Sequence, residues 1–237
     1  MRILTIGDGF AANLGWPQWP EILGLITKNT EVITLGKLGA GNEFIFNSVL
    51  SYIEKENVDL VLIQWALQHR LDLVVDNEIK SAIVESDPVY RNNYYKIGHN
   101  TWWLSSGSKI DYVTNYHNNY IGFRQAKIRY ENYIISMTAI LKNKKIPYLY
   151  FSTYKMEAFM SQRIDWKDFV IYLPGIGMEE YSRQDRFKTL RGDKAQPSSY
   201  VHLCWLNEYV KPKLPSLEWD EKIISELLET YQKTKEG

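Results

Sequence analysis

The chain has 237 residues, enough for one large domain or two small ones. The 28 Lys and Arg residues balance the 28 Asp and Glu residues, so no overall attraction to nucleic acid or to an anionic membrane is expected. The single cysteine, Cys204, excludes an internal disulfide and a cysteine-based zinc site. With no recognisable signal peptide and no run of roughly 20 apolar residues, we expect a cytoplasmic protein without a membrane span.

Short apolar runs alternate with helix-like periodicity along most of the chain. Strands are expected at residues 3–6, 32–35, 58–65, 146–151 and 169–173, and helices at 20–28, 42–56, 121–143, 198–211 and 216–233. Apolar strands that alternate with helices indicate a parallel sheet covered on both faces. The sequence therefore predicts a three-layer, doubly wound α/β/α domain with a mostly parallel sheet of about five strands.

Two stretches interrupt this alternation, and we interpret both as insertions in a single domain that spans residues 1–237. Residues 155–197 are irregular, and residues 71–119 are rich in asparagine and aromatic residues. Long loops of this kind usually cover a site or mediate contacts. Adjacent aromatic pairs in the first insertion are expected first to pack onto the sheet; the alternatives are a surface for a protein partner and, after that, stacking on a ligand. These pairs are Tyr94, Tyr95, Trp102 and Trp103.

The first apolar run ends at Gly7-Asp8-Gly9, at the carboxyl end of its expected strand. Ligands of open α/β sheets bind beyond that end. The turn fits a loose G-x-G-x-x-A dinucleotide fingerprint, which requires a helix to begin at once. Pro17 and Pro20 interrupt that helix, and no acidic residue for a ribose follows the strand at 32–35. A dinucleotide site is therefore disfavoured, and no cofactor is expected.

Taken together with later blocks, the turn resembles the SGNH (GDSL-type) hydrolase family. Gly7-Asp8-Gly9-Phe10, followed by Trp19-Pro20, is similar to the first block of that family, and the Gly36–Asn42 loop is similar to the second. The stretch from Asp193 to Pro197, followed by His202, is similar to the last block, and the spacing is closest to hydrolase-like proteins of tailed phages. The resemblance implies an acyl-transfer site in which Gly39 would offer a backbone N–H to an oxyanion.

The departures from the family concern the reacting groups. Gly9 stands where the family has its nucleophilic serine, and glycine has no side chain that could attack an acyl carbon. Gln68 is the nearest residue to the asparagine of the third block, and Gln196 takes the place of the basic histidine if Asp193 is the acid. A glutamine amide cannot accept and return a proton near neutral pH. A shifted register would make His202 the base, with a serine in place of the acid.

These departures predict a hydrolase-like protein that has lost serine-hydrolase activity and serves a binding or structural role, for example in a phage particle. The alternative is an active esterase or carbohydrate deacetylase that uses Asp8 and His202. The ligand would be a carbohydrate or an acyl group; nucleic acid is not expected, and no two histidines have the spacing of a helical metal-ligand pair. The candidate site positions are Asp8, Gly9, Gly39, Asn42, Gln68, Asp193, Gln196 and His202.

Overall fold

A four-stranded parallel sheet with the strand order β2-β1-β3-β7 lies at the centre of the computed structural model. Its strands are β1 (Arg2–Ile6), β2 (Glu31–Thr34), β3 (Leu60–Trp65) and β7 (Tyr148–Ser152). The strand expected at 169–173 lies outside the described residues. The structure describes residues 1–12, 16–68, 70, 72–75, 94–96, 102–105, 123–152, 163–164, 167, 181–184, 187 and 197–233.

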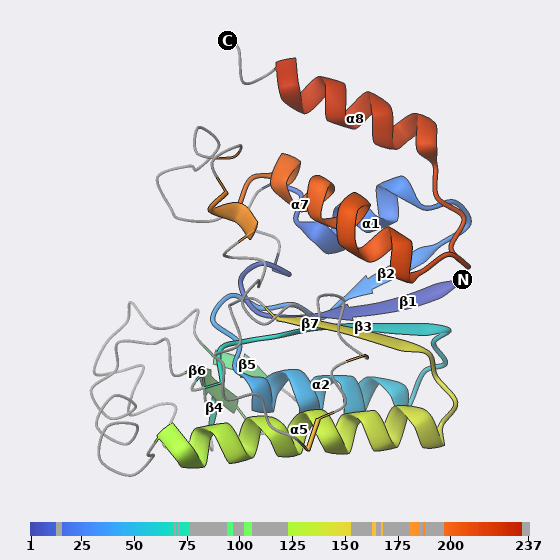
Figure 1. The fold of residues 1–237 in the computed structure, drawn as a ribbon. Coiled ribbons are helices and arrows are strands. Elements are labelled where there is room, and N and C mark those ends of the chain that lie inside the picture. The colour runs from blue at the N-terminus through green and yellow to red at the C-terminus, as the bar shows by residue number, and fades with distance from the viewer. Residues whose placement is uncertain are drawn as a thin grey trace.

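Helices cover both faces of this sheet (Figure 1). One face carries α1 (Trp19–Ile26) and α7 (Ser199–Trp205), with α8 (Glu221–Lys233) packed outside them. The other face carries α2 (Asn42–Ile53) and α5 (Phe123–Asn143). After α7 the chain continues through a π-helical turn at Leu206–Val210 and a 3-10 turn at Lys211–Lys213. The predicted three-layer α/β/α architecture with a parallel sheet is confirmed.

A second, antiparallel sheet lies within residues 71–119. It consists of β4 (Asp72–Val75), β5 (Tyr94–Lys96) and β6 (Trp102–Ser105), in the order β4-β6-β5. Val74 is paired with Trp103, and Tyr95 is paired with the same residue from the other side. The sheet lies beside the end of α2 that begins at Asn42 (Figure 1). The sequence did not predict these strands, because each is short and the intervening composition is polar.

The core consists of two apolar layers, one on each face of the parallel sheet. Side chains of a strand alternate between faces, so Ile3 and Leu62 pack with α1 and α7, whereas Leu4 and Ile63 pack with α2 and α5. All six residues of β3 are buried, which explains why the strand is apolar along most of its length.

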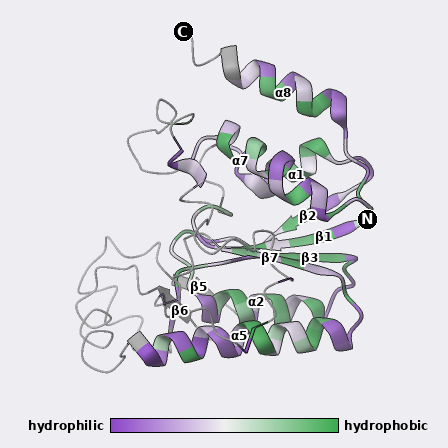
Figure 2. Ribbon diagram, viewed as in Figure 1, coloured by the Kyte–Doolittle hydropathy of each residue, from purple (hydrophilic) through white to green (hydrophobic). Residues whose placement is uncertain are grey.

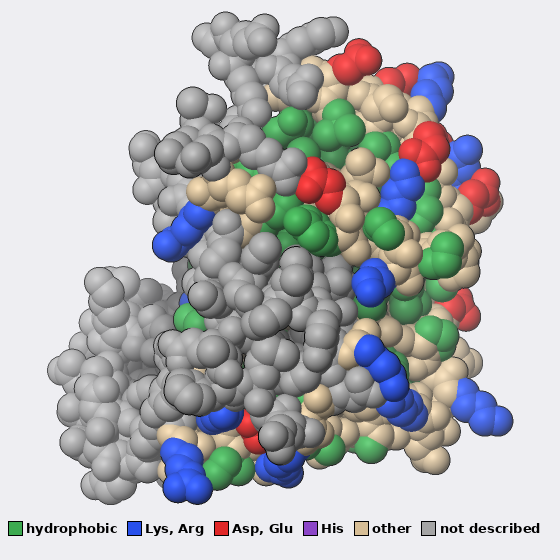
Figure 3. Space-filling model, in the orientation of Figure 1, with side chains coloured by type: hydrophobic (Ala, Val, Ile, Leu, Met, Phe, Trp, Pro, Cys, Tyr) green, Lys and Arg blue, Asp and Glu red, His purple; other side chains and the backbone are tan. Residues whose placement is uncertain are grey.

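Hydropathy along the helices follows this layering. Hydrophobic segments of the helices alternate with hydrophilic ones, as expected for helices that bury one face (Figure 2). Basic and acidic side chains share the face drawn in Figure 3, in keeping with the zero net charge. Among the described helices, none combines the length and the apolar content that a membrane-spanning segment requires.

We predict opposite effects of alanine at two glycines, Gly24 in α1 and Gly36 after β2. At Gly36 a Cβ atom would lie 2.1 Å from the carbonyl oxygen of Ala11, so Gly36→Ala must push apart the loops after β1 and β2. The expected loss is about 1–3 kcal/mol of unfolding free energy. At Gly24, inside α1, the nearest atom would be Val32 Cγ2 at 3.5 Å, an ordinary contact. Gly24→Ala is therefore expected to stabilise the protein by up to about 1 kcal/mol. Urea unfolding of both variants measures the difference, and equal effects would contradict it.

Candidate functional site

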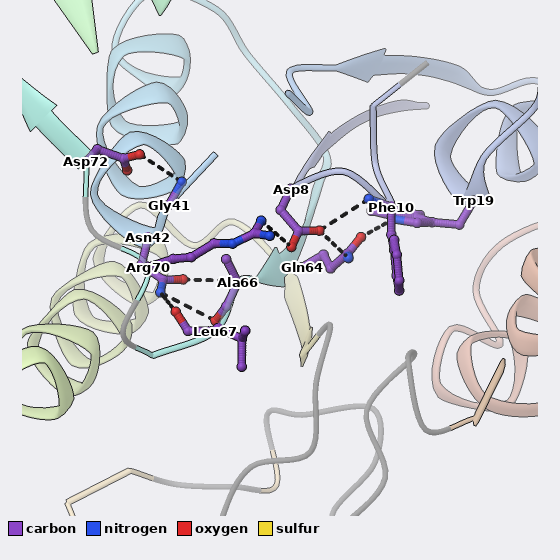
Figure 4. Close-up of polar contacts among 10 residues, drawn as sticks. All are labelled: Asp8, Phe10, Trp19, Gly41, Asn42, Gln64, Ala66, Leu67, Arg70 and Asp72. Carbon is purple, nitrogen blue, oxygen red and sulfur yellow. Dashed lines mark hydrogen bonds and ion pairs between the residues drawn. The ribbon is translucent and has the colours of Figure 1, made fainter. Parts of the chain in front are cut away.

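The carboxylate of Asp8, directly after β1, accepts hydrogen bonds from the described residues Phe10, Gln64 and Arg70 (Figure 4). Its Oδ1 accepts the Phe10 backbone N–H at 3.2 Å and the Gln64 Nε2 amide at 3.0 Å. Its Oδ2 accepts Arg70 Nη1 at 3.1 Å in an ion pair. The Asp8 side chain is only 3% exposed, whereas that of Arg70 is 24% exposed. Burying a carboxylate is costly unless it is paired and hydrogen-bonded, and these three donors meet that requirement.

Gln64 extends the Asp8 network into the sheet. It lies in β3, is fully buried, and accepts a hydrogen bond from the indole Nε1 of Trp19 while its amide nitrogen donates to Asp8. The side chain of Gln64 also occupies the space beside Gly7, where an added Cβ would lie 2.7 Å from Gln64 Cβ. The network therefore explains why glycine precedes Asp8 and why tryptophan opens α1. Gln64 was not among the predicted site residues, although a lone polar residue in an apolar strand is a signal for a buried hydrogen bond.

Asn42, the first residue of α2, holds the chain where it leaves β3. Its Nδ2 donates to the carbonyl oxygens of Leu67 at 2.9 Å and Ala66 at 3.4 Å, and its Oδ1 accepts the Ala66 N–H at 2.9 Å. The same turn carries Gln68, which is half-buried, and Arg70. Asn42 therefore supports the segment that brings Arg70 to Asp8 (Figure 4).

Asp72, which was not predicted from the sequence either, occupies the N-terminus of α2. Its Oδ1 accepts the Gly41 N–H at 2.9 Å, and its Oδ2 accepts the Phe44 N–H at 2.7 Å. These bonds satisfy two backbone donors that a helix leaves without partners in its first turn. Burial raises the pKa of the Asp72 carboxyl to about 7, although the two backbone N–H groups act in the opposite direction. The charge of Glu43 raises this pKa further, and the charge of Arg70 lowers it.

The parallel sheet brings several predicted positions to its carboxyl edge. Asp8 and Gly9 follow β1 and are buried, and Gly39 and Asn42 follow the neighbouring strand β2. Gly39 has a φ of 80°, a conformation that favours glycine. Gln68 follows β3, on the other side of β1. Asp193 and Gln196 lie outside the described residues, so their roles stay predictions.

His202 lies in α7 and is fully buried. Its imidazole packs edge-on against the ring of Phe10, with 6.2 Å between the ring centroids. Neither of its nitrogens has a hydrogen-bond partner among the described residues. Burial lowers the pKa of His202 to about 3, so the ring is neutral near pH 7. The alternative of an active esterase requires this imidazole to reach a hydroxyl or carboxylate, and it makes no such bond to any residue that the structure describes.

No family model and no curated protein matches the chain. Among solved structures, the chain is similar to a G-D-S-L family protein from Desulfitobacterium hafniense DCB-2 that is described as lipolytic. The two share 18% sequence identity at a TM-score of 0.28, over 66% of this chain and 81% of the other. A likeness this distant carries no argument about function, which must come from the residues themselves.

We predict that Asp8 and Arg70 are energetically coupled. Arg70→Leu leaves the buried Asp8 carboxylate without its cation and should cost about 2 kcal/mol of unfolding free energy. In the Asp8→Asn background the same change should cost less, with a coupling of about 1 kcal/mol. Denaturant unfolding of the four proteins measures this coupling. The exposed pair Lys222–Glu226 is the matched control and should show almost none. Additive losses at Asp8 and Arg70 would show that the ion pair is dispensable.

We also predict that His202 limits stability in acid. Its pKa is lower in the folded protein, about 3, than the ordinary value of 6.5 in the unfolded chain. Between these values the unfolded chain binds the extra proton, so stability is fully present above about pH 6.5 and falls by up to about 1.4 kcal/mol per unit as the pH decreases. His202→Leu removes this contribution, so the wild-type protein should lose stability relative to the variant as the pH falls from about 6 to about 4, whatever the net slope that other groups such as Asp72 produce. Thermal unfolding across that range tests it, and an unchanged slope would exclude His202 as the cause.

Proposed function

We propose that this chain is a hydrolase-like α/β protein that binds a ligand at the carboxyl edge of its sheet without serine-based acyl transfer. The observation that carries the proposal is the engagement of Asp8. This carboxylate lies next to Gly9, where the related hydrolases have their nucleophile, and it accepts three hydrogen bonds, one of them from the Arg70 cation. A carboxylate with its oxygens committed to fixed donors is a poor nucleophile and a poor base. Asp8 therefore does not replace the missing serine.

The state of His202 supports the same proposal. A general base must lie within hydrogen-bond reach of the proton that it removes, and a third group normally orients it. His202 is buried against Phe10, and in the part of the chain that the structure describes its two nitrogens have no hydrogen-bond partner. Among the described residues, His202 therefore lacks the contacts that a general base requires.

The chemistry of the ligand follows from the resemblance to SGNH hydrolases, whose substrates are acyl and acetyl esters. We propose an acetylated carbohydrate or a related acyl compound, held where Gly9, Gly39 and the turn with Gln68 and Arg70 meet. A protein partner, for example in a phage particle, would use the antiparallel sheet that contains β5 and β6. The aromatic residues of that proposed surface are Tyr94, Tyr95, Trp102 and Trp103.

The proposal predicts binding without turnover. Acetylated chito-oligosaccharides and short acyl esters should shift the amide signals of Gly9, Gly39 and Arg70 in NMR spectra, while hydrolysis stays at the buffer rate. Gly9→Ser, which supplies a hydroxyl but no base, should remain inactive, and Gly9→Ala controls for the added volume. Removing one member of a nucleophile–base–acid set abolishes most of the rate acceleration, so one restored member is not sufficient.

Two outcomes would overturn this proposal. Hydrolysis by the wild-type protein well above background, lost in Asp8→Asn or in His202→Leu, would show that the chain is an enzyme with rearranged residues. Signal shifts that avoid Gly9, Gly39 and Arg70 would place any ligand elsewhere. A Gly9→Ser variant that gains turnover would show that a base is already in place.

A further inference from the structure

We propose that Asp72 is a proton-controlled clasp that fastens the β4-β6-β5 sheet to the N-terminus of α2. The proposal concerns a conformational device and does not depend on what the neighbouring edge binds. Gain of a proton on Asp72 closes the clasp, and its loss loosens the clasp. Release would uncover backbone N–H groups of α2 beside Gly39 and Asn42.

Asp72 belongs to β4 and also contacts the first turn of α2, and this double attachment makes it a clasp. It is the first residue of β4, which pairs with β6 along its whole length from Asp72↔Ser105 to Val75↔Trp102. Its carboxyl group also accepts the N–H groups of Gly41 and Phe44 in the first turn of α2. The start of β4 cannot move away from the parallel-sheet domain without breaking both hydrogen bonds.

The helix end is shaped to receive this carboxyl group. A Cβ atom on Gly41 would lie 2.7 Å from Asp72 Oδ2 and 2.8 Å from Oδ1, so only glycine allows the group to sit this close. Asp72 is 3% exposed, and water therefore does not solvate its charge. Close packing therefore fixes the carboxyl group of Asp72 in a buried position where its ionisation is unfavourable.

Charged and titratable groups face Asp72 from each described element around it. Glu43 on α2 raises the pKa of Asp72, and Arg70 on the turn before β4 lowers it. On α5, Arg129 and a hydrogen bond from Tyr133 act on Glu43, and both lower the pKa of Glu43, which burial raises. Asp8 forms an ion pair with Arg70, and its negative charge therefore limits how far the guanidinium group lowers the pKa of Asp72. The negative and positive neighbours of Asp72 therefore oppose each other, and burial is the largest influence.

The direction of the switch follows from linkage. In the clasped state burial raises the pKa of Asp72 to about 7, whereas an exposed aspartate has a pKa of about 3.9. The clasped state binds the proton more tightly than the released state, so protonation favours closure. As the pH rises from about 4 to about 7, the equilibrium shifts toward release, and above about pH 7 it no longer changes. Near neutral pH the carboxyl group is partly ionised, so small changes in pH alter the clasp.

Amide hydrogen exchange tests the clasp directly. Protection factors for Gly41, Phe44 and the β4–β6 pair Val74 and Trp103, corrected for intrinsic exchange, should fall about tenfold or more between about pH 5 and pH 7 and then level off. Asp72→Asn cannot ionise, so it should remove this pH dependence. Asp59→Asn is the matched control, because Asp59 also accepts a backbone N–H, that of Arg2 at 2.7 Å, at the opposite end of the sheet. It should leave the wild-type profile unchanged.

A second variant keeps the test decisive if Asp72→Asn does not fold. Glu43→Gln removes the neighbouring charge that raises the pKa of Asp72, so the pH at which protection levels off should move down. A flat profile in the wild-type protein between about pH 5 and pH 7 would overturn the proposal. The proposal would also be overturned if Asp72→Asn kept the pH dependence of the wild-type protein. The same holds if the pH at which protection levels off stays in place or moves up in Glu43→Gln.

Discussion

The buried carboxylate of Asp8 is the constraint on which the edge of the sheet depends. A charge in this position requires donors from outside its own turn, and the structure supplies them from β3 and from the turn that follows it. Gln64 is therefore polar in a strand that is otherwise apolar, and its second function is to receive the Trp19 indole. Gly7 lacks a side chain because Gln64 fills that space. One buried charge thus accounts for the residue types at several positions of the first motif.

The same bonds bear on what the site can do. A carboxylate that is available for chemistry must have an oxygen directed at a substrate, whereas those of Asp8 face Phe10, Gln64 and Arg70. The aspartate of the Gly7-Asp8-Gly9 turn is thereby a structural anchor, and acyl transfer would depend on a hydroxyl that Gly9 does not have. The edge retains its left-handed glycine, Gly39, and the half-exposed turn of Gln68 and Arg70. The proposed recognition of a ligand rests on these features.

The sequence predicted those parts of the structure that local patterns encode. The apolar run at 58–65 predicted β3, which begins at Leu60 and is buried on both faces, and Pro20 marked the start of α1 to within one residue. The antiparallel sheet was missed because strands of three or four residues leave no periodic signal. Asp72 was missed for a different reason: its partners on α2 lie 28 and 31 residues earlier in the chain. A contact of that kind is determined by tertiary packing, which no local window contains.

Asp8 and Asp72 are both buried carboxyl groups that are stabilised in different ways, and Arg70 influences both. Asp8 is compensated by direct contact with the guanidinium group, whereas Asp72 relies on the N-terminus of α2, where backbone N–H groups favour a negative charge. Arg70 lowers the pKa of Asp72 through its electrostatic field, whereas the field of Glu43 raises this pKa. Since the Arg70 cation is directed at Asp8, the carboxyl group of Asp72 remains close to the point at which it gains a proton. The arrangement that fixes the turn after β1 therefore also leaves the attachment of the antiparallel sheet sensitive to pH.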